Sequence, residues 1–311
     1  MSSAQPELPK VLSIGVPAHN EEESIERMLK SVLNQTAWKA LPRERKEIIV
    51  CANACTDHTV DIVKRMQSAH PEIKLIETPQ KGKTVAWNIL KENANTMAEA
   101  VFFFDADVIV QRRTVQRLWS DLTQNPEIYV VAANVVPTAA LLSPGKIQNP
   151  ISRFYSRTRR AQKAAGKLES KIYGAGYAIR RKALERISMP EEGNLPEDIF
   201  LTGAIGRNKI MRSQYASVYY RAPRVIMDVY RERLRQKLGI AALKNKYPEI
   251  EFPKLMNLRE QWAVFKSLPL REKAYYALLK AVDVAASARA RQLMGKGKKD
   301  VWKKTKSTKL K

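Results

Sequence analysis

The stretch Val101-Phe102-Phe103-Phe104-Asp105-Ala106-Asp107 decides the fold class of this chain, because a short apolar run ends abruptly in two carboxylates. No polar residue interrupts the run, and its residue types favour pleated structure, so we predict a strand buried on both faces. Alternation along an extended chain puts Asp105 and Asp107 on the same side. Two such carboxylates are costly without a cation or donors between them. The pair therefore predicts a divalent metal that carries a phosphorylated ligand, or simply a solvated strand end.

Strand and helix signals alternate on both sides of this stretch. Predicted strands span residues 11–16, 47–52, 73–76, 101–104 and 128–136, and predicted helices span 25–33, 60–69, 84–97 and 115–122. A helix between successive strands predicts right-handed βαβ units. We therefore expect an α/β fold with a mostly parallel central sheet flanked by helices.

Polar loops follow three of the predicted strands, at Asn20, at 53–57 and at 105–107. Asn20 and Glu23 also have the spacing of a capping box, which predicts the start of a helix. Because ligands bind at the carboxyl ends of strands in parallel sheets, the three loops predict one binding site.

The charge balance limits the partners that this chain can have. Its 311 residues carry a net charge of +24, so we expect phosphate on nucleic acid, nucleotide or anionic lipid. The cysteines, Cys51 and Cys55, are too few for a four-cysteine zinc site or a disulfide framework and suit a reducing compartment. The N-terminus lacks an apolar signal core, and no run of about eighteen apolar residues predicts a transmembrane helix.

The C-terminal half of the chain has a different pattern. A basic segment, 153–186, contains a glycine-rich strand at 173–181, and Glu197-Asp198 stands at a predicted helix start. Helices are expected at 227–246, 258–268 and 270–294, the last with an apolar face. We divide the chain into an N-terminal arm (1–9), a catalytic domain (10–225), a helical region (226–294) and a basic, disordered tail (295–311).

Over roughly residues 10 to 240, the chain resembles family 2 glycosyltransferases of the GT-A fold. The resemblance rests on the order of several short motifs. These are Pro17-Ala18-His19-Asn20-Glu21, Asn53-x-Cys55-Thr56-Asp57-x-Thr59, Lys81-Gly82-Lys83, Asp105-Ala106-Asp107, Tyr173-Gly174-Ala175-Gly176, Glu197-Asp198 and the stretch from Arg231 to Gly239.

The resemblance implies a role for each motif. The nucleotide-sugar donor would be bound by Pro17, Ala18, Asn20, Glu21, Asn53, Asp57, Lys83, Asp105, Ala106, Asp107 and Arg235. Asp107 and Asp105 would bind Mg2+ or Mn2+, and Gly174 and Gly176 would lie on the acceptor side. Asp198, with Glu197 beside it, occupies the position of the acceptor-activating base. Arg235 is the only match to the family's Gln-x-x-Arg-Trp element.

The same residues predict the reaction independently of the family. A cation at Asp107 and the charge of Lys83 or Arg235 would stabilise a departing nucleoside diphosphate. Asp198 could remove the proton of an acceptor hydroxyl. One base and no protein nucleophile imply direct displacement and inversion at the sugar carbon.

Several alternatives stay open at this point. We expect a UDP-sugar donor and a lipid or lipid-linked acceptor at the cytoplasmic face of the membrane, where a basic protein would bind peripherally. A soluble acceptor is the alternative. A nucleotidyltransferase would need a glycine-rich and basic first loop, whereas residues 17–21 are acidic. Nucleic acid is not the expected partner, because no zinc spacing, stacking motif or helix-turn-helix is recognised.

Overall fold

The computed structural model describes residues 8–138, 172, 174–191, 195–250, 252 and 258–295. These residues form two compact units. The sheet unit contains the described residues up to 135 and from 172 to 220, and the helical unit contains 136–138 and those from 221 onward. The predicted N-terminal arm, up to residue 7, lies outside the described residues. So do residues 139–171, which include the first part of the basic segment 153–186, as well as Tyr173 and the tail from 296.

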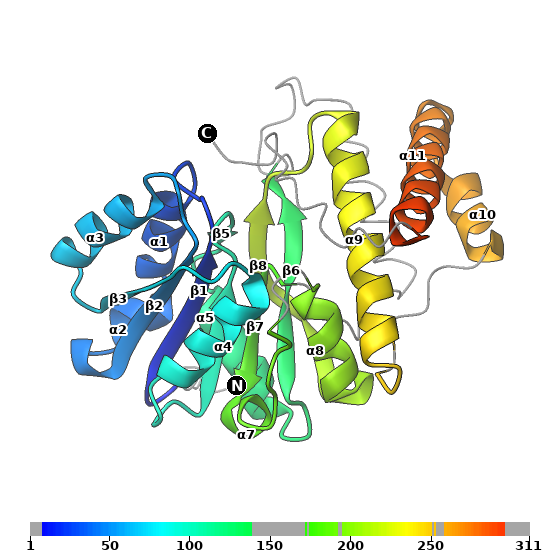
Figure 1. The fold of residues 1–311 in the computed structure, drawn as a ribbon. Coiled ribbons are helices and arrows are strands. Elements are labelled where there is room, and N and C mark those ends of the chain that lie inside the picture. The colour runs from blue at the N-terminus through cyan, green and yellow to red at the C-terminus, as the bar shows by residue number, and fades with distance from the viewer. Residues whose placement is uncertain are drawn as a thin grey trace. The chain divides into compact units, whose positions relative to one another are not determined.

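A mixed sheet forms the centre of the sheet unit (Figure 1), and among the described residues it has eight strands in the order β3-β2-β1-β4-β7-β6-β8-β5. The strands are β1 (Leu12–Ala18), β2 (Lys46–Asn53), β3 (Ile73–Thr78), β4 (Ala100–Phe104), β5 (Ile109–Val110), β6 (Val130–Pro137), β7 (Gly176–Arg180) and β8 (Ile210–Tyr220). The first four in this order pair in parallel, whereas β7 is antiparallel to β4 and β6, and β5 is antiparallel to β8. The predicted α/β fold is confirmed, and the predicted strands correspond to the four parallel strands and to β6 and β7, whereas β5 and β8 were not predicted.

Helices cover both faces of this sheet. They are α1 (Ile25–Leu33), α2 (Thr36–Ala40), α3 (Thr59–Ala69), α4 (Lys83–Asn93), α5 (Thr114–Gln124), α7 (Arg181–Leu184) and α8 (Glu197–Ile205), with 3-10 turns at Arg43–Arg45 and Arg207–Lys209. Alternate residues of β1, such as Ile14, belong to one core cluster with the apolar faces of α1, α3 and α5. Gly15, which lies between two of these residues, faces α4. A Cβ atom added to Gly15 would lie 3.4 Å from Leu90 Cβ.

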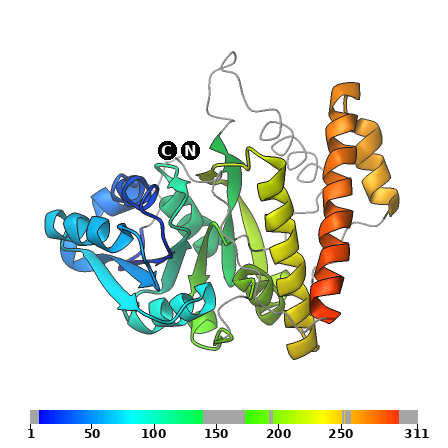
Figure 2. The ribbon, with the colours of Figure 1, turned by 45° about the horizontal axis from the view of Figure 1, so that its top comes forward.

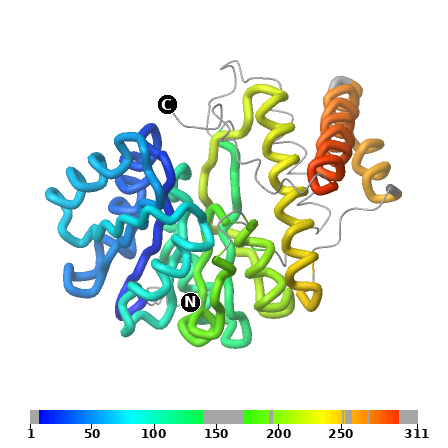
Figure 3. The backbone as a smooth tube through the Cα atoms, viewed as in Figure 1, coloured from blue at the N-terminus to red at the C-terminus, as the bar shows by residue number. Residues whose placement is uncertain are grey.

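The order in which strands are added to the sheet reverses after β3 (Figure 3). From β1 it passes outward through β2 to β3, and α4 then returns it to β4 on the other side of β1. Because β1, β2, β3 and β4 are parallel, their carboxyl ends meet at one edge around this reversal. Such reversals are where open α/β sheets bind ligands.

An aromatic stack joins α4 to the sheet. The ring of Phe103 stacks on both Trp87 and Tyr177, with 5.4 Å between ring centroids in each pair. Trp87 Nε1 also donates a hydrogen bond of 2.8 Å to Tyr177 Oη. All three side chains are buried. The stack holds α4, β4 and β7 together, and therefore the residues at their ends, which include Lys83 and Asp105.

Three local predictions are wrong. The first strand was predicted to end at residue 16, but β1 continues through Pro17 to Ala18. It pairs with β4 only over residues 13–15, so the missing N–H of Pro17 breaks no bond on that side. Helix α1 begins at Ile25 without a side-chain cap, because the Asn20 amide bonds to Thr56 instead of forming a capping box. Helix α4 stops at Asn93 rather than Met97, because the next residue has an extended backbone.

The helical unit contains α9 (Ile226–Lys246), α10 (Leu258–Ser267) and α11 (Leu270–Gly295). Helices α9 and α11 lie side by side (Figure 2), and Leu234 contacts Ala286, Ala290 and Leu293 in one buried cluster. Helix α10 packs on α11 through a smaller cluster centred on Tyr276. The predicted helical C-terminal region is confirmed. Within the residues described, none of the helices combines the length and the apolar character needed to cross a bilayer.

Candidate active site

A lysine paired with two carboxylates lies at the carboxyl edge of the parallel strands. Lys83 Nζ is 2.6 Å from Asp105 Oδ1, and it also forms an ion pair with Glu197 Oε1. Lys83 begins α4, Asp105 follows β4, and Glu197 begins α8. We call these three residues the carboxylate–lysine cluster. Three separate elements thus bring these residues together, and two of them, Lys83 and Glu197, lie more than a hundred positions apart in the sequence.

The ionisation of this cluster is tightly coupled. The pKa of Asp105 is raised to about 7, because burial raises it more than the Lys83 ammonium lowers it, and the carboxylates of Asp107 and Glu197 raise it further. Burial would lower the pKa of Lys83, but Asp105 and Glu197 together hold it well above its usual range. Lys83 therefore stays charged. The cluster and Asp107 together carry three acidic groups for one ammonium, which suits a site that attracts a further cation.

Gly174 leaves the room that this ion pair needs. A Cβ atom at Gly174 would collide with Glu197 Oε1 and lie 2.9 Å from Lys83 Nζ. At Gly176 a Cβ atom would instead lie 2.9 Å from both Phe104 Cδ1 and Val218 Cγ1. Gly174 thus borders the carboxylate–lysine cluster, whereas Gly176 is required by core packing. The acceptor-side roles expected for both residues stay predictions.

Asn53, at the end of β2, links three loops at this edge. Its Nδ2 donates to Ala18 O at 2.9 Å, and its Oδ1 accepts from the Gly82 N–H at 3.2 Å. Its own carbonyl oxygen is 2.7 Å from His19 Nδ1. Asn53 is buried, so this amide orders the loops that follow β1, β2 and β3.

The loop after β1 is joined to the loop after β2 by further hydrogen bonds. Asn20 Oδ1 accepts from the Thr56 N–H at 2.7 Å, and the Asn20 N–H points to Cys55 Sγ at 3.4 Å. The Glu21 N–H donates to Thr59 Oγ1 at 2.6 Å. These bonds make the two loops a single rigid surface. Its threonine and cysteine contacts were not predicted, although the polar run 53–59 pointed to a turn.

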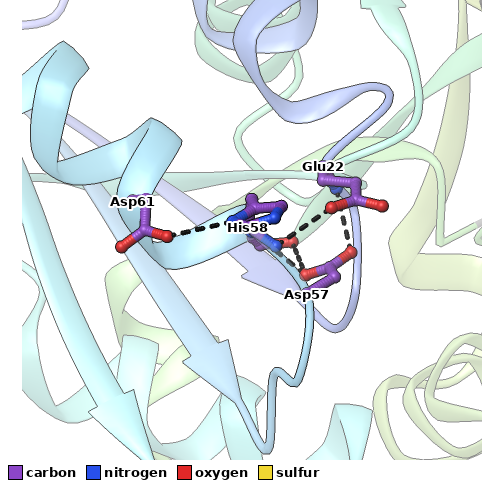
Figure 4. A network of polar contacts seen from close by, with 5 residues as sticks. Glu22, Asp57, His58 and Asp61 are labelled. Carbon is purple, nitrogen blue, oxygen red and sulfur yellow. Dashed lines mark hydrogen bonds and ion pairs between the residues drawn. The ribbon is translucent and has the colours of Figure 1, made fainter.

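Asp57 and Glu22 extend this surface toward α3 (Figure 4). Asp57 Oδ2 accepts from the Glu22 N–H at 3.2 Å, and Asp57 Oδ1 accepts from the Thr59 N–H at 3.0 Å. In return, Glu22 Oε2 accepts from the His58 N–H at 3.0 Å. The His58 ring lies 3.3 Å from Asp61 and is mostly exposed. Asp57 therefore shapes the loop through backbone contacts.

Two residues of these loops have a left-handed backbone. Asn20 has φ 54° and Ala54 has φ 47°. Asparagine tolerates this conformation, but alanine rarely adopts it, and here the Ala54 N–H donates to Thr78 O at 2.7 Å. Backbone strain of this kind clusters at ligand-binding sites.

Asp198 stands beside the carboxylate–lysine cluster in sequence but has different contacts. Its Oδ1 accepts from the Ile199 N–H at 2.9 Å, and its carbonyl oxygen accepts from Thr202 Oγ1 at 2.6 Å. The side chain is half-buried, whereas Glu197 is buried. The two acids of the motif thus differ, since only Glu197 pairs with Lys83. Arg235 lies on α9 in the helical unit, and its donor-binding role stays a prediction.

The sequence profile of glycosyl transferase family 2 matches residues 13–188, which is more than half of the chain. The chain belongs to this family. The matched segment includes β1 to β4, the loops described above, and Lys83, Asp105, Asp107, Gly174 and Gly176.

Individual relatives agree with this membership. The chain is 30% identical over 200 residues to the probable glycosyltransferase YdaM of Bacillus subtilis (strain 168), covering 63% of this chain and 46% of that protein. It is 24% identical over 226 residues to the poly-beta-1,6-N-acetyl-D-glucosamine synthase of Staphylococcus aureus (strain COL), covering 71% and 52%. The chain therefore spans about half the length of the curated relatives that it matches.

Similarity to solved structures shows that the chain has the GT-A fold. The mannosyltransferase PcManGT from Pyrobaculum calidifontis, in complex with GDP-Man and Mn2+, has a TM-score of 0.57 and 22% identity, with 94% of this chain and 80% of that chain covered. S. aureus TarS 1–349 in complex with UDP has a TM-score of 0.50 and 18% identity, with 92% of each covered.

The acids of this site suit a cation that is shared with a ligand. Within the described residues, no group of three or more His, Cys, Asp and Glu side chains is arranged to hold a metal alone. Asp105 and Asp107 nevertheless interact electrostatically, and their oxygen atoms are the ligands that Mg2+ and Mn2+ prefer. Mg2+ is commonly held by one or two carboxylates together with substrate phosphates. The residues therefore fit a metal that binds with a diphosphate.

Proposed function

We propose that this glycosyltransferase moves a sugar from a nucleoside diphosphate sugar, with UDP as the expected nucleotide, to an acceptor hydroxyl with inversion. The carboxylate–lysine cluster, beside loops joined by Asn53, is the observation that carries the proposal. The loops offer backbone and amide groups to a base and ribose, and the cluster offers charge to a diphosphate. Asn20, Glu21, Asn53 and Asp57 act here mainly by fixing the loop backbone.

The reaction that we propose is a single displacement. The acceptor oxygen attacks the anomeric carbon, the bond from that carbon to the diphosphate oxygen breaks, and the acceptor proton passes to the Asp198 carboxylate. The Lys83 ammonium neutralises part of the charge that develops on the departing diphosphate. Glu197 and Asp105 hold Lys83 at the edge where this charge would appear.

A divalent cation held by Asp107, with Asp105 beside it, would supply further positive charge to the diphosphate. The charge balance supports this proposal, because a diphosphate would otherwise meet three acidic groups and one ammonium. Mn2+ in the PcManGT complex supports the same chemistry in a protein of this fold. Mg2+ and Mn2+ are therefore the cations to compare.

A lipid or lipid-linked acceptor at the cytoplasmic face of a membrane completes the proposal. The net charge of +24 supports the proposal that the protein acts at an anionic membrane surface. A soluble acceptor is the alternative. Family membership gives no support to the nucleotidyltransferase and nucleic-acid-binding alternatives.

Release of nucleoside diphosphate from a panel of UDP- and GDP-sugars, with Mg2+, Mn2+ or a chelator, tests the proposed donor chemistry. We expect metal-dependent release of UDP, and loss of that release in Asp107→Asn. Asp61→Asn is the matched control, because Asp61 is 73% exposed and contacts only the His58 ring among the contacts described. Release that persists in chelator, or that the Asp107 variant retains, would contradict the metal role. Release from GDP-sugars alone would contradict UDP.

A further inference from the structure

Helix α11 leaves a long apolar face in solvent. Leu270, Leu278 and Val284 are 84%, 46% and 66% exposed. Five exposed alanines lie on the same face, Ala274, Ala277, Ala281, Ala285 and Ala288, and the exposed Gln292 lies at its C-terminal end. Their spacing of three and four residues forms one stripe along the helix. The face that packs on α9 is a different one, centred on Ala286 and Ala290.

Charged residues are distributed unevenly around this stripe. At about 100° per residue, Lys273, Arg289 and Arg291 border it on its two sides. The acids of α11, Glu272 and Asp283, lie on the opposite side of the helix. Glu272 is buried, and Asp283 is 3.6 Å from Arg233 Nε and 3.9 Å from Lys280 Nζ. The border of the stripe is therefore basic. The two acidic side chains face the interior of the helical unit or pair with basic residues of that unit.

Helix α10 adds an exposed aromatic residue with a basic neighbour. Trp262 is 56% exposed and stacks on Phe265 at 5.1 Å between centroids. Lys266 Nζ lies 5.6 Å from the centroid of the Trp262 ring. An amphipathic ring beside an ammonium group is typical of residues at a membrane–water interface.

We propose that the stripe of α11, with its basic border, docks on the surface of an anionic lipid bilayer. Apolar side chains of an interfacial helix insert at the headgroup boundary, while bordering lysines and arginines reach the lipid phosphates. A second copy of the chain fits less well, because it would bring the same basic borders against each other. This inference rests on the proposed membrane-face function and names the surface that would carry it.

Sedimentation of the full chain with phosphatidylcholine vesicles, with and without phosphatidylglycerol, tests the proposal at low and high salt. We expect binding only to phosphatidylglycerol vesicles and release at high salt. Arg289→Gln/Arg291→Gln should weaken partitioning at low salt by about 30-fold, since each basic residue near an anionic surface contributes roughly fivefold. Arg43→Gln/Arg45→Gln is the matched control, since both arginines are exposed in the sheet unit, have the same spacing, and change the net charge equally.

Leu278→Glu/Val284→Glu tests the apolar part and should reduce binding by more than about 30-fold. Its control is Met97→Glu/Tyr215→Glu, which changes two residues of the sheet unit that are 74% and 66% exposed. The proposal would be overturned if the chain bound neutral and anionic vesicles equally, or if each variant and its control lost the same amount of vesicle binding. A different outcome would assign the stripe to a second copy of the chain: the unchanged chain self-associates without binding vesicles, and Leu278→Glu/Val284→Glu abolishes this self-association. Nucleoside diphosphate release is measured in parallel, so that failure of vesicle binding is distinguished from failure of the donor chemistry.

Discussion

Lys83→Met should destabilise the sheet unit in a way that depends on pH. The substitution keeps the apolar stem of the side chain and removes the ammonium that lies between Asp105 and Glu197. Breaking a buried ion pair from one side costs about 3–5 kcal/mol. Lys83 and Asp105 keep 28% and 25% of their side-chain surface exposed, so solvent screens part of this cost. We expect the free energy of unfolding to fall by about 2–3 kcal/mol at about pH 8.5.

The pH dependence follows from the pKa of Asp105. Its folded-state value of about 7 lies above the ordinary value of 3.8, so the folded chain binds this proton more tightly than the unfolded chain does. Asp105 therefore stabilises the fold at low pH, and this stabilisation is lost as the pH rises from about 4 through about 7. Without Lys83 the pKa of Asp105 rises further, so the variant loses more stability over this range. At about pH 5.5, where Asp105 is protonated, the difference should shrink to about half.

Urea denaturation of the two proteins at both pH values measures this difference. Lys64→Met is the matched control, because it removes an ion pair of similar length, 2.9 Å to Glu77, whose two side chains are more than half exposed. It should change stability little and equally at both pH values. A Lys83→Met effect as small as that of the control, or one that does not grow with pH, would refute the assigned coupling.

The remaining predictions concern the reaction and the core. Asp107→Asn should abolish metal-dependent release of nucleoside diphosphate and leave the melting temperature unchanged; an unchanged rate would remove Asp107 from the metal site. Asp198→Asn should slow sugar transfer to the acceptor by a factor of about 10²–10⁴, while donor affinity measured by calorimetry changes little. Near-normal transfer would show that another residue is the base, with Glu197 as the next candidate. Gly176→Ala should cost about 1–3 kcal/mol of unfolding free energy through contacts with Phe104 and Val218. Gly295→Ala meets no atom within 4 Å and is its control, so an equal loss in both would contradict the packing argument.

The sequence predicted which residues belong to the candidate site, but not which of them form ion pairs. Asp105, Asp107, Lys83 and Glu197 each stand at a strand or helix end, where local pattern makes a polar residue conspicuous. No spacing rule pairs Lys83 with Glu197, because a chain separation of this length is closed only by the packing of α4 and α8 on the sheet. The sequence interpretation of Asn20 as a cap failed for the same reason, since a partner from the next loop satisfied its amide.

The sequence by itself determined the parallel half of the sheet. Its strands are short segments rich in apolar residues, and a helix lies between each strand and the next, so the local pattern is enough to identify them. Strands β6 and β7 were predicted at residues 128–136 and 173–181, but only the tertiary structure decided their antiparallel pairing and added strands β5 and β8. Strand β8 contains Arg212 and Gln214, and it is a strand because neighbours on both sides, β6 and β5, bind its backbone. The same holds for α11, where the tertiary structure decided which apolar face packs on α9 and which stays in solvent, since two faces of one helix compete for a single partner.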